Sequence, residues 1–85
     1  MPEVSRFYGI VITFNYDDHL PPHFHARYGD YRATLALEGA VLAGTLPPRG
    51  LALVRAWAHL HREELSTDWE LARRSEPVLP IPPLD

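Results

Sequence analysis

The fold is decided by residues 23–37, which read His23-Phe24-His25-Ala26-Arg27-Tyr28-Gly29-Asp30-Tyr31-Arg32-Ala33-Thr34-Leu35-Ala36-Leu37. Polar and apolar side chains alternate on both sides of the Gly29-Asp30 pair, which is the pattern of two half-buried strands joined by a two-residue turn. Glycine at the first position of the pair suits a type II′ turn. The pattern therefore predicts an antiparallel hairpin with strands at 23–28 and 31–37.

The turn sets the register of this hairpin. Tyr28 faces Tyr31, Arg27 faces Arg32, and the pairing continues to Phe24 opposite Leu35. Since successive side chains of a strand point to opposite faces, the hairpin has an apolar face and a polar face. The apolar face carries Phe24, Ala26, Tyr28, Tyr31, Ala33, Leu35 and Leu37, and the other carries His23, His25, Arg27, Arg32, Thr34, Ala36 and Glu38. We expect the apolar face to pack on a helix and the histidine and arginine face to stay open.

The segments on either side of the hairpin also indicate strands. Residues 7–16 are β-branched and aromatic, with apolar side chains on both faces, which predicts one central strand. Gly9 within it indicates a bulge or a close backbone approach. Two prolines and an aspartate pair make residues 17–22 a loop. Glu38-Gly39 predicts a second tight turn that leads to a short strand at 40–43.

The second half of the chain has helical periodicity. Pro47-Pro48 favours a helix start. Apolar side chains and one histidine then recur every three or four positions at Leu51, Val54, Trp57, Ala58, His61 and Leu65, which makes one helix face. We expect Ser66-Thr67 to end this helix and the capping box Thr67-Asp68-Trp69-Glu70 to start a short second helix that runs to Arg74. The proline-rich tail at 76–85 must be extended, and it covers either its own domain or a second copy of the chain.

These segments together predict a single α+β domain of 85 residues. We expect a small antiparallel sheet of three to four strands, a C-terminal helix packed on one face, a short second helix and an extended tail. The sheet part covers 1–44, the helical part 47–75 and the tail 76–85. The chain has no cysteine, which excludes disulfides and thiolate zinc sites. It has no apolar run of about 20 residues and no secretory signal, so we expect a soluble cytoplasmic protein without a membrane partner.

The charge balance disfavours nucleic acid as a partner. Eight basic residues, all of them arginine, oppose eleven acidic ones, for a net charge of −3. Two of the arginines, Arg27 and Arg32, are predicted to face each other across the hairpin, and like charges in that position destabilise a sheet. We expect a compensating anion there, which is a phosphate, a partner's carboxylate, or a local side chain such as Glu38, Asp17 or Asp18.

The histidines suggest a metal site. His23 and His25 lie two residues apart on one strand, about 6.6 to 6.8 Å along it, so both imidazoles can reach one divalent ion such as zinc. His19, Asp17 or Asp18 could supply a third ligand from the preceding loop. The alternative is a strand face whose histidines bond neighbouring carboxylates or water. The same histidines with Arg27 and Arg32 would also suit metal-independent phosphodiester cleavage, since a histidine can move protons while a guanidinium holds the phosphate.

The remaining histidines and the tryptophans are expected to be structural. His59 and His61 lie two apart on a helix and point to different sides, so they cannot chelate one ion together. His59 should be solvated and His61 should lie at the edge of the core. Trp57 and Trp69 fit core positions better than a stacking platform.

Several motifs resemble a known family. The run Asp17-Asp18-His19-Leu20-Pro21-Pro22-His23-Phe24-His25, together with Ser5 to Ile10, Tyr28 to Ala33, Leu60 to Leu65 and Asp68 to Ala72, closely resembles the small prokaryotic family known as domain of unknown function 4160. The resemblance implies a bacterial or archaeal protein that is often encoded beside a second small protein. Such pairs are similar to toxin–antitoxin modules.

Three hypotheses follow from the sequence. The first, which we prefer, is a protein-interaction module of a two-gene, toxin–antitoxin-like system that binds its partner, or a second copy, through the face of His23, His25, Arg27 and Arg32 or through an open sheet edge. The second is a small ribonuclease-like toxin that uses the same four residues as catalytic candidates. The third is a divalent-metal-binding domain built on His19, His23 and His25 with Asp17 or Asp18.

Overall fold

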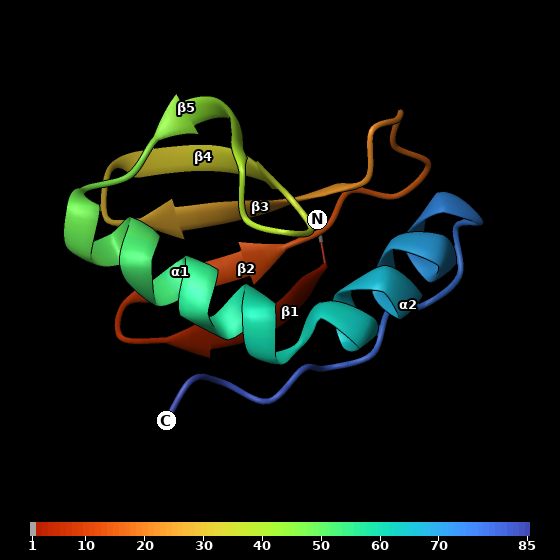
Figure 1. The fold of residues 1–85 in the computed structure, drawn as a ribbon. Coiled ribbons are helices and arrows are strands. Elements are labelled where there is room, and N and C mark those ends of the chain that lie inside the picture. The colour runs from red at the N-terminus through yellow and green to blue at the C-terminus, as the bar shows by residue number, and fades with distance from the viewer. Residues whose placement is uncertain (1) are drawn as a thin grey trace.

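Five antiparallel strands and two helices make up the computed structural model, which describes residues 2–85. The strands are β1 (Glu3–Phe7), β2 (Ile10–Thr13), β3 (His23–Tyr28), β4 (Tyr31–Ala36) and β5 (Val41–Thr45), and the helices are α1 (Pro48–Leu60) and α2 (Arg62–Arg73). The strands form one sheet in the order β1-β2-β3-β4-β5. Figure 1 shows α1 lying across one face of the sheet and α2 extending past the end of the sheet, beside the loop between β2 and β3. The α+β class is confirmed, but the sheet has five strands rather than three to four.

The additional strand comes from a turn that the sequence analysis did not separate. Tyr8 and Gly9 both have positive φ, at 50° and 81°, which is the backbone of a type I′ hairpin turn. This turn divides the predicted strand at 7–16 into the end of β1 and the whole of β2. The interpretation of Gly9 as a bulge or close approach was therefore wrong, because the glycine supplies the second positive φ of the turn. The expected central position is confirmed for β2, which lies between β1 and β3.

The central hairpin has the predicted register. Tyr28 pairs with Tyr31, Arg27 with Arg32, and Phe24 with Leu35. Gly29 has a φ of 59°, whereas Asp30 is not among the residues with positive φ, in agreement with a type II′ turn. The last strand, β5, begins one residue later and ends two residues later than predicted.

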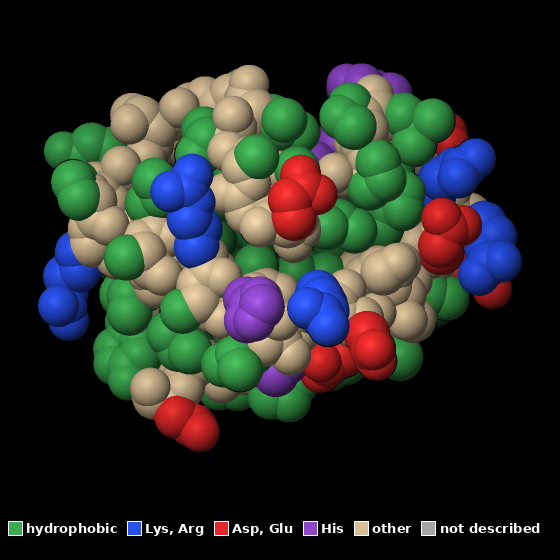
Figure 2. All heavy atoms as spheres, viewed as in Figure 1, with side chains coloured by type: hydrophobic (Ala, Val, Ile, Leu, Met, Phe, Trp, Pro, Cys, Tyr) green, Lys and Arg blue, Asp and Glu red, His purple; other side chains and the backbone are tan. Residues whose placement is uncertain are grey.

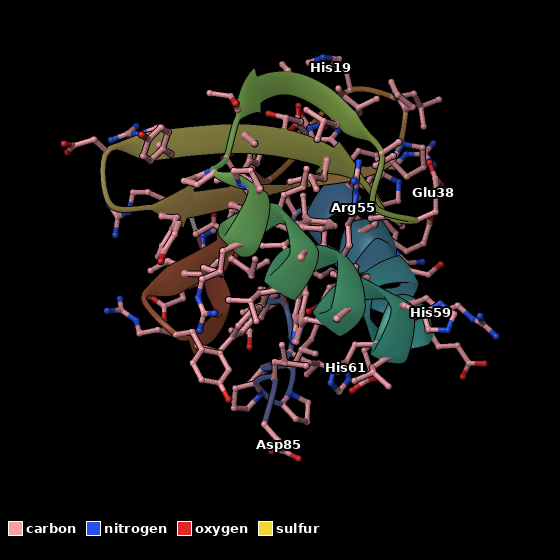
Figure 3. All side chains as sticks on the ribbon, turned by 60° about the vertical axis from the view of Figure 1, so that its left-hand side comes forward. His19, Glu38, Arg55, His59, His61 and Asp85 are labelled. Atoms are coloured by element: carbon pink, nitrogen blue, oxygen red, sulfur yellow. The ribbon has the colours of Figure 1, made fainter. Side chains whose placement is uncertain are left out.

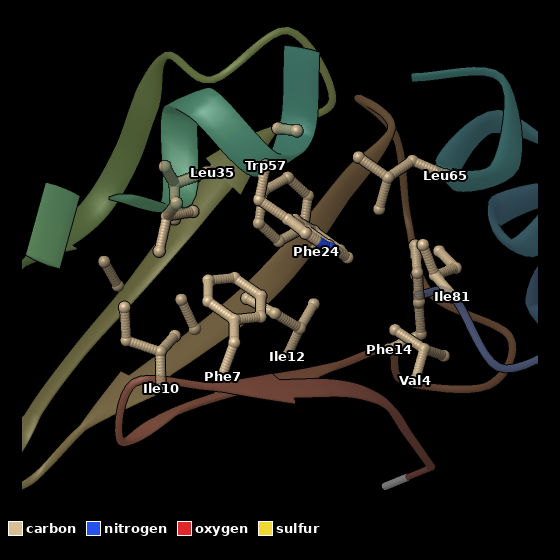
Figure 4. Close-up of a cluster of buried hydrophobic side chains, with 14 of the residues drawn as sticks. Val4, Phe7, Ile10, Ile12, Phe14, Phe24, Leu35, Trp57, Leu65 and Ile81 are labelled. Carbon is tan, nitrogen blue, oxygen red and sulfur yellow. The ribbon is translucent and has the colours of Figure 1, made fainter. Parts of the chain in front are cut away.

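The core lies between the helix-covered face of the sheet and α1. Trp57 is fully buried at its centre, with its ring centroid 5.4 Å from that of Phe7 and 5.9 Å from that of Phe24. Ile10, Ile12 and Leu35 fill the space around it, as Figure 4 shows. Each buried side chain of this size contributes roughly 1.5–3 kcal/mol of transfer free energy. The apolar face of the hairpin therefore anchors the sheet to α1, and the core positions predicted for Trp57 and Trp69 are confirmed.

The break between the helices lies at His61 and not at Ser66-Thr67. The φ and ψ of His61 are −116° and 28°, which is not helical. Hydrogen bonds from His61 N to Trp57 O and from Leu65 N to His61 O nevertheless connect the end of α1 to the start of α2. Ser66 and Thr67 lie inside α2, so the predicted capping box is wrong. Tertiary packing overrides their weak helix propensity, because α2 buries a continuous stripe along one side. That stripe consists of Leu65, Asp68, Trp69 and Ala72. Within residues 2–85, neither helix is long or apolar enough to cross a membrane.

The tail packs on its own domain. Ile81 is buried in the core, and its backbone N–H donates to the carbonyl of Val4 at 2.8 Å. The indole N–H of Trp57 donates to the carbonyl of Pro82 at 2.9 Å. The tail therefore covers its own domain, which is the first of the two alternatives expected for it.

A buried carboxyl group helps to hold the tail. Asp68 is 1% exposed, and its Oδ1 accepts a hydrogen bond from the backbone N–H of Leu79 at 2.8 Å. Its Oδ2 is buried without a hydrogen-bond partner among residues 2–85. Burial raises the pKa of the Asp68 carboxyl; the hydrogen bond from Leu79 opposes this rise, and the charge of Glu64 adds to it. Folding therefore shifts this carboxyl toward its protonated form relative to the unfolded chain.

We expect Asp68 to make folding stability depend on pH. Since the folded-state pKa is raised above its ordinary value of 3.8, the unfolded chain releases this proton at lower pH than the folded chain. The stability that Asp68 contributes is therefore complete below that pH and is lost as the pH rises toward the folded-state pKa. As the pH rises from about 3 to about 7, the melting temperature of the wild type should fall relative to that of Asp68→Asn. An equivalent comparison with Glu63→Gln, at an exposed position, should show no such trend, and a constant offset for Asp68→Asn would contradict the prediction.

Candidate functional site

The sheet face opposite α1 is hollowed into a groove of about 550 Å³. Alternate residues of β2, β3 and β4 point into it, because their neighbours in the sequence point into the core. The groove, which we call the open-face groove, is lined by Glu3, Val11, Thr13, His25, Ala26, Arg27, Arg32, Ala33, Thr34, Ala43 and Gly44. Three members of the predicted histidine and arginine face, His25, Arg27 and Arg32, are thus brought together with Thr34.

Two unpaired guanidinium groups dominate the charge of this groove. Arg27 and Arg32 are exposed Cα partners in adjacent strands, and neither has a hydrogen bond or an ion pair within the part of the chain that the structure describes. The local carboxylates expected as alternatives, Glu38, Asp17 and Asp18, do not pair with them. No ion pair within residues 2–85 therefore offsets the cross-strand repulsion between the two arginines.

The one acidic residue at the groove already has a partner. Glu3 accepts two hydrogen bonds from Arg6, at 2.8 Å and 3.1 Å. The hydrogen bond from Arg6 is the main cause that lowers the pKa of Glu3, and the more distant charge of Arg27 contributes less. Glu3 is therefore ionised but committed to Arg6, which leaves the arginine pair available to an external anion.

The opposite face of the molecule has a different charge pattern. Figure 2 shows the face that carries the helices, where basic and acidic side chains lie close together, most clearly over α2. Arg73 lies 3.7 Å from Glu70 and Arg74 lies 2.9 Å from Glu76. Arg73 and Arg74 thus have local partners of opposite charge, in contrast to the two arginines of the open-face groove.

A second group of polar side chains lies where the β2–β3 loop meets β3. The Nε2 of His23 donates to Oδ2 of Asp18 at 2.8 Å, and the Nε2 of His25 lies 3.6 Å from the same oxygen. One ligand atom from each of these residues lies within 4.8 Å of the other two. We call Asp18, His23 and His25 the His-Asp cluster.

Both imidazole rings of the cluster are oriented by their other nitrogen. The Nδ1 of His23 donates to the carbonyl of Pro21 at 2.7 Å, and the Nδ1 of His25 lies 3.3 Å from the hydroxyl of Thr34. The amide of Asn15 donates to Nε2 of His25 at 3.2 Å, so this nitrogen carries a lone pair. The Nε2 atoms of both rings therefore point toward Asp18. Fixing one ring nitrogen so that the other faces a common point is the arrangement that metal-ligating histidines use.

The electrostatics of the cluster differ from residue to residue. Burial alone would raise the pKa of Asp18, but hydrogen bonds from the backbone of His19 and the ring of His23 outweigh it, so this pKa is lowered. Burial lowers the pKa of His25; the nearby carboxylate of Asp18 opposes this, and the charge of His23 adds to it. The cluster thus holds an ionised carboxylate and a neutral His25. Both ring nitrogens of His23 face acceptors, the carbonyl of Pro21 and Oδ2 of Asp18.

His23 is buried, which corrects the expectation of an open histidine face. It is 5% exposed, and the ring of Trp69 lies 5.2 Å from its own. The reason is that α2 continues past the end of the sheet and covers the start of β3. Only His25 of the two strand histidines therefore reaches the open-face groove.

Of the three loop residues proposed as third ligand, Asp18 is the one that joins the cluster. The side chain of His19 is 88% exposed, and its Nδ1 lies 3.0 Å from the other oxygen of Asp18, outside the group. Asp17 is exposed, with a φ of 52°, and its backbone N–H donates to the carbonyl of Ala72. Figure 3 shows His19 at the periphery of the molecule, well away from His59 and His61. His61 is partly buried and contacts Glu64 at 2.9 Å, whereas His59 is exposed.

The structure adds Asn15, Pro21 and Trp69 to the site. The cross-strand partner of His25, Thr34, was already placed beside it by the hairpin register. Asn15 carried no signal, because the sequence analysis included it in a strand. Trp69 carried none, because the helix break was misplaced and with it the direction of α2.

The comparisons with known proteins identify a family but no characterised relative. A family model described as Domain of unknown function (DUF4160) matches residues 9–70. This range includes the His-Asp cluster and both groove arginines. No curated protein and no solved structure gives a significant match.

We expect the Asp18–His23 pair to support the fold. Asp18→Ala leaves the buried Nε2 of His23 without its hydrogen-bond partner, and an unsatisfied buried polar group costs about 1–3 kcal/mol of unfolding free energy. His19→Ala, which changes the adjacent exposed ring, should stay within about 0.5 kcal/mol of the wild type. Urea denaturation measures both values, and equally small losses would show that the pair does not stabilise the loop.

Proposed function

The chain belongs to the family described as Domain of unknown function (DUF4160), and we propose that it is a protein-interaction module whose open-face groove binds an acidic segment of a partner protein. The observation that carries this proposal is the pair of exposed guanidinium groups, Arg27 and Arg32, which face each other and form no ion pair with a carboxylate among residues 2–85. A carboxylate from a partner would relieve their repulsion. The fork of each guanidinium can form two parallel hydrogen bonds with such a group.

The surroundings of the arginines suit a short extended peptide. Threonine hydroxyls at Thr13 and Thr34 and small apolar side chains at Ala43 and Val11 line the groove beside them. A volume of about 550 Å³ is within the range of roughly 300–1,000 Å³ found for ligand sites. This mixture of a few charged groups on an otherwise small and apolar surface favours recognition of a defined segment.

A protein is a better partner than a nucleic acid because of charge. With a net charge of −3, the molecule as a whole repels a polyanion, whereas one acidic segment feels chiefly the two nearby arginines. The family resemblance implies a second small protein encoded beside this one, in a toxin–antitoxin-like pair. We propose that this neighbour supplies the acidic segment.

The test compares two double variants of equal net charge. Arg27→Gln/Arg32→Gln should weaken binding of the purified neighbouring gene product about 100-fold in isothermal titration calorimetry, because both charged contacts are lost. Arg62→Gln/Arg73→Gln, which changes two exposed arginines of α2, should bind like the wild type. Equal weakening by both variants would contradict a groove-specific role. RNA cleavage by the wild type that is lost in His25→Ala would favour the ribonuclease alternative instead.

We propose binding of a divalent metal such as zinc as a second function, favoured by the convergence of the His-Asp cluster. Two imidazoles and one carboxylate form a ligand set typical of zinc and of other first-row transition metals. The hydrogen bonds from the cluster histidines to Pro21 and Thr34 would then act as the outer contacts that hold the ligands in place. Magnesium and calcium prefer oxygen ligands and would bind poorly here.

The metal function has its own matched variants. We expect the wild type to bind one Zn²⁺ per chain, and His25→Ala to lower the affinity by more than about 100-fold because it removes a ligand. Thr34→Val should lower the affinity for Zn²⁺ about tenfold, because the outer contact to His25 is lost. His59→Ala, which changes an exposed histidine of α1, should leave this affinity unchanged. Calorimetry with Zn²⁺ measures these affinities. Unchanged affinity in His25→Ala would exclude the cluster as the binding site.

A further inference from the structure

One residue belongs to both candidate sites. The Nε2 of His25 faces Asp18 within the His-Asp cluster, and the side chain of His25 also lines the open-face groove. Thr34, whose hydroxyl lies 3.3 Å from Nδ1 of His25, lines the groove as well. The two sites are therefore neighbours on the same pair of strands.

Access to the cluster increases toward the groove. The side chains of His23, Asp18 and His25 are 6%, 12% and 24% exposed. Trp69 covers the ring of His23, and the loop carbonyl of Pro21 bonds its Nδ1. A ligand that approaches an ion held by this cluster would therefore meet it past His25, where the groove lies.

The number of ligands leaves room for such an approach. Zinc sites with three protein ligands keep a further coordination position for water or for an added ligand, and a carboxylate oxygen is a usual occupant. Arg27 and Arg32 also prefer a carboxylate. Both parts of the proposed site therefore attract the same chemical group.

The spacing of the strand indicates how the carboxylates should be arranged. His25 and Arg27 are two residues apart on one face of β3, which is about 6.6 to 6.8 Å along the strand. An extended peptide presents every second side chain on one side at the same interval. A segment with acidic residues at alternate positions could thus place one carboxylate at the metal and the next between the arginines.

We propose that the metal ion and the arginine pair form one composite site for an extended peptide with alternating acidic residues, in which one carboxylate takes the open coordination position of the metal. This inference rests on both parts of the proposed function. It has a thermodynamic consequence, because metal and peptide must then increase each other's affinity by the same factor.

The experiment titrates a synthetic peptide, Glu-Ser-Glu-Ser-Glu, into the full chain, first with one equivalent of Zn²⁺ and then after treatment with EDTA. We expect Zn²⁺ to increase the affinity for the peptide about tenfold, and the peptide to increase the affinity for Zn²⁺ equally. For a peptide of the same composition with adjacent glutamates, Ser-Glu-Glu-Glu-Ser, the metal should increase the affinity by a smaller factor. Arg27→Gln/Arg32→Gln should still bind Zn²⁺ but should lose the peptide. His59→Ala should behave like the wild type.

A spectroscopic measurement separates direct ligation from simple charge attraction. With Co²⁺ in place of Zn²⁺, addition of the alternating peptide should change the visible absorption of the ion, because a carboxylate enters its coordination sphere. If no metal binds, both the metal function and the composite site are refuted. If metal binds and the arginines bind the peptide independently of it, or if the affinity rises without a spectral change, the composite site alone is refuted and the two functions stand separately.

Discussion

The register of the β3–β4 hairpin is the constraint on which the molecule depends. The two-residue turn at Gly29-Asp30 sets which residues face each other, and a shift of one residue would move every side chain to the opposite face. With the observed register, Phe24 and Leu35 contribute to the core under α1, while Arg27 and Arg32 meet on the open side. The same backbone hydrogen bonds that anchor the core therefore create the charged floor of the groove.

The loop before β3 connects this hairpin to the rest of the domain. Asp18 reaches back to His23 through a short hydrogen bond, and α2 covers that contact with Trp69. The chain then returns along the tail, where Asp68 of α2 binds the backbone of Leu79. The loop, the second helix and the tail thus depend on one another, and the His-Asp cluster lies at their junction with the sheet.

The molecule retains several groups that do not favour stability. The paired arginines repel each other, Asp18 and His23 are withdrawn from water where they meet, and one oxygen of Asp68 is buried without a hydrogen-bond partner among residues 2–85. Well-packed apolar residues in place of both partners of such a pair are often neutral or stabilising, whereas removal of one partner alone is costly. The first two lie at the open-face groove and the His-Asp cluster, where a binding function explains why charge is kept, whereas Asp68 has a structural role in holding the tail.

The sequence by itself determined the features that depend on local chemistry. Turn residues and period-two alternation specified the central hairpin, the opposition of Arg27 and Arg32, and the placement of Thr34 beside His25, because each follows from backbone geometry within about ten residues. Helical spacing likewise identified Trp57 as a core residue. Only the tertiary structure decided the features that depend on distant segments. These are the choice of Asp18 over Asp17 and His19, the burial of His23, and the continuation of α2 through Ser66 and Thr67. All three follow from the direction of α2 after His61, which is set by how its buried stripe packs against the loop and the tail and which no local pattern encodes.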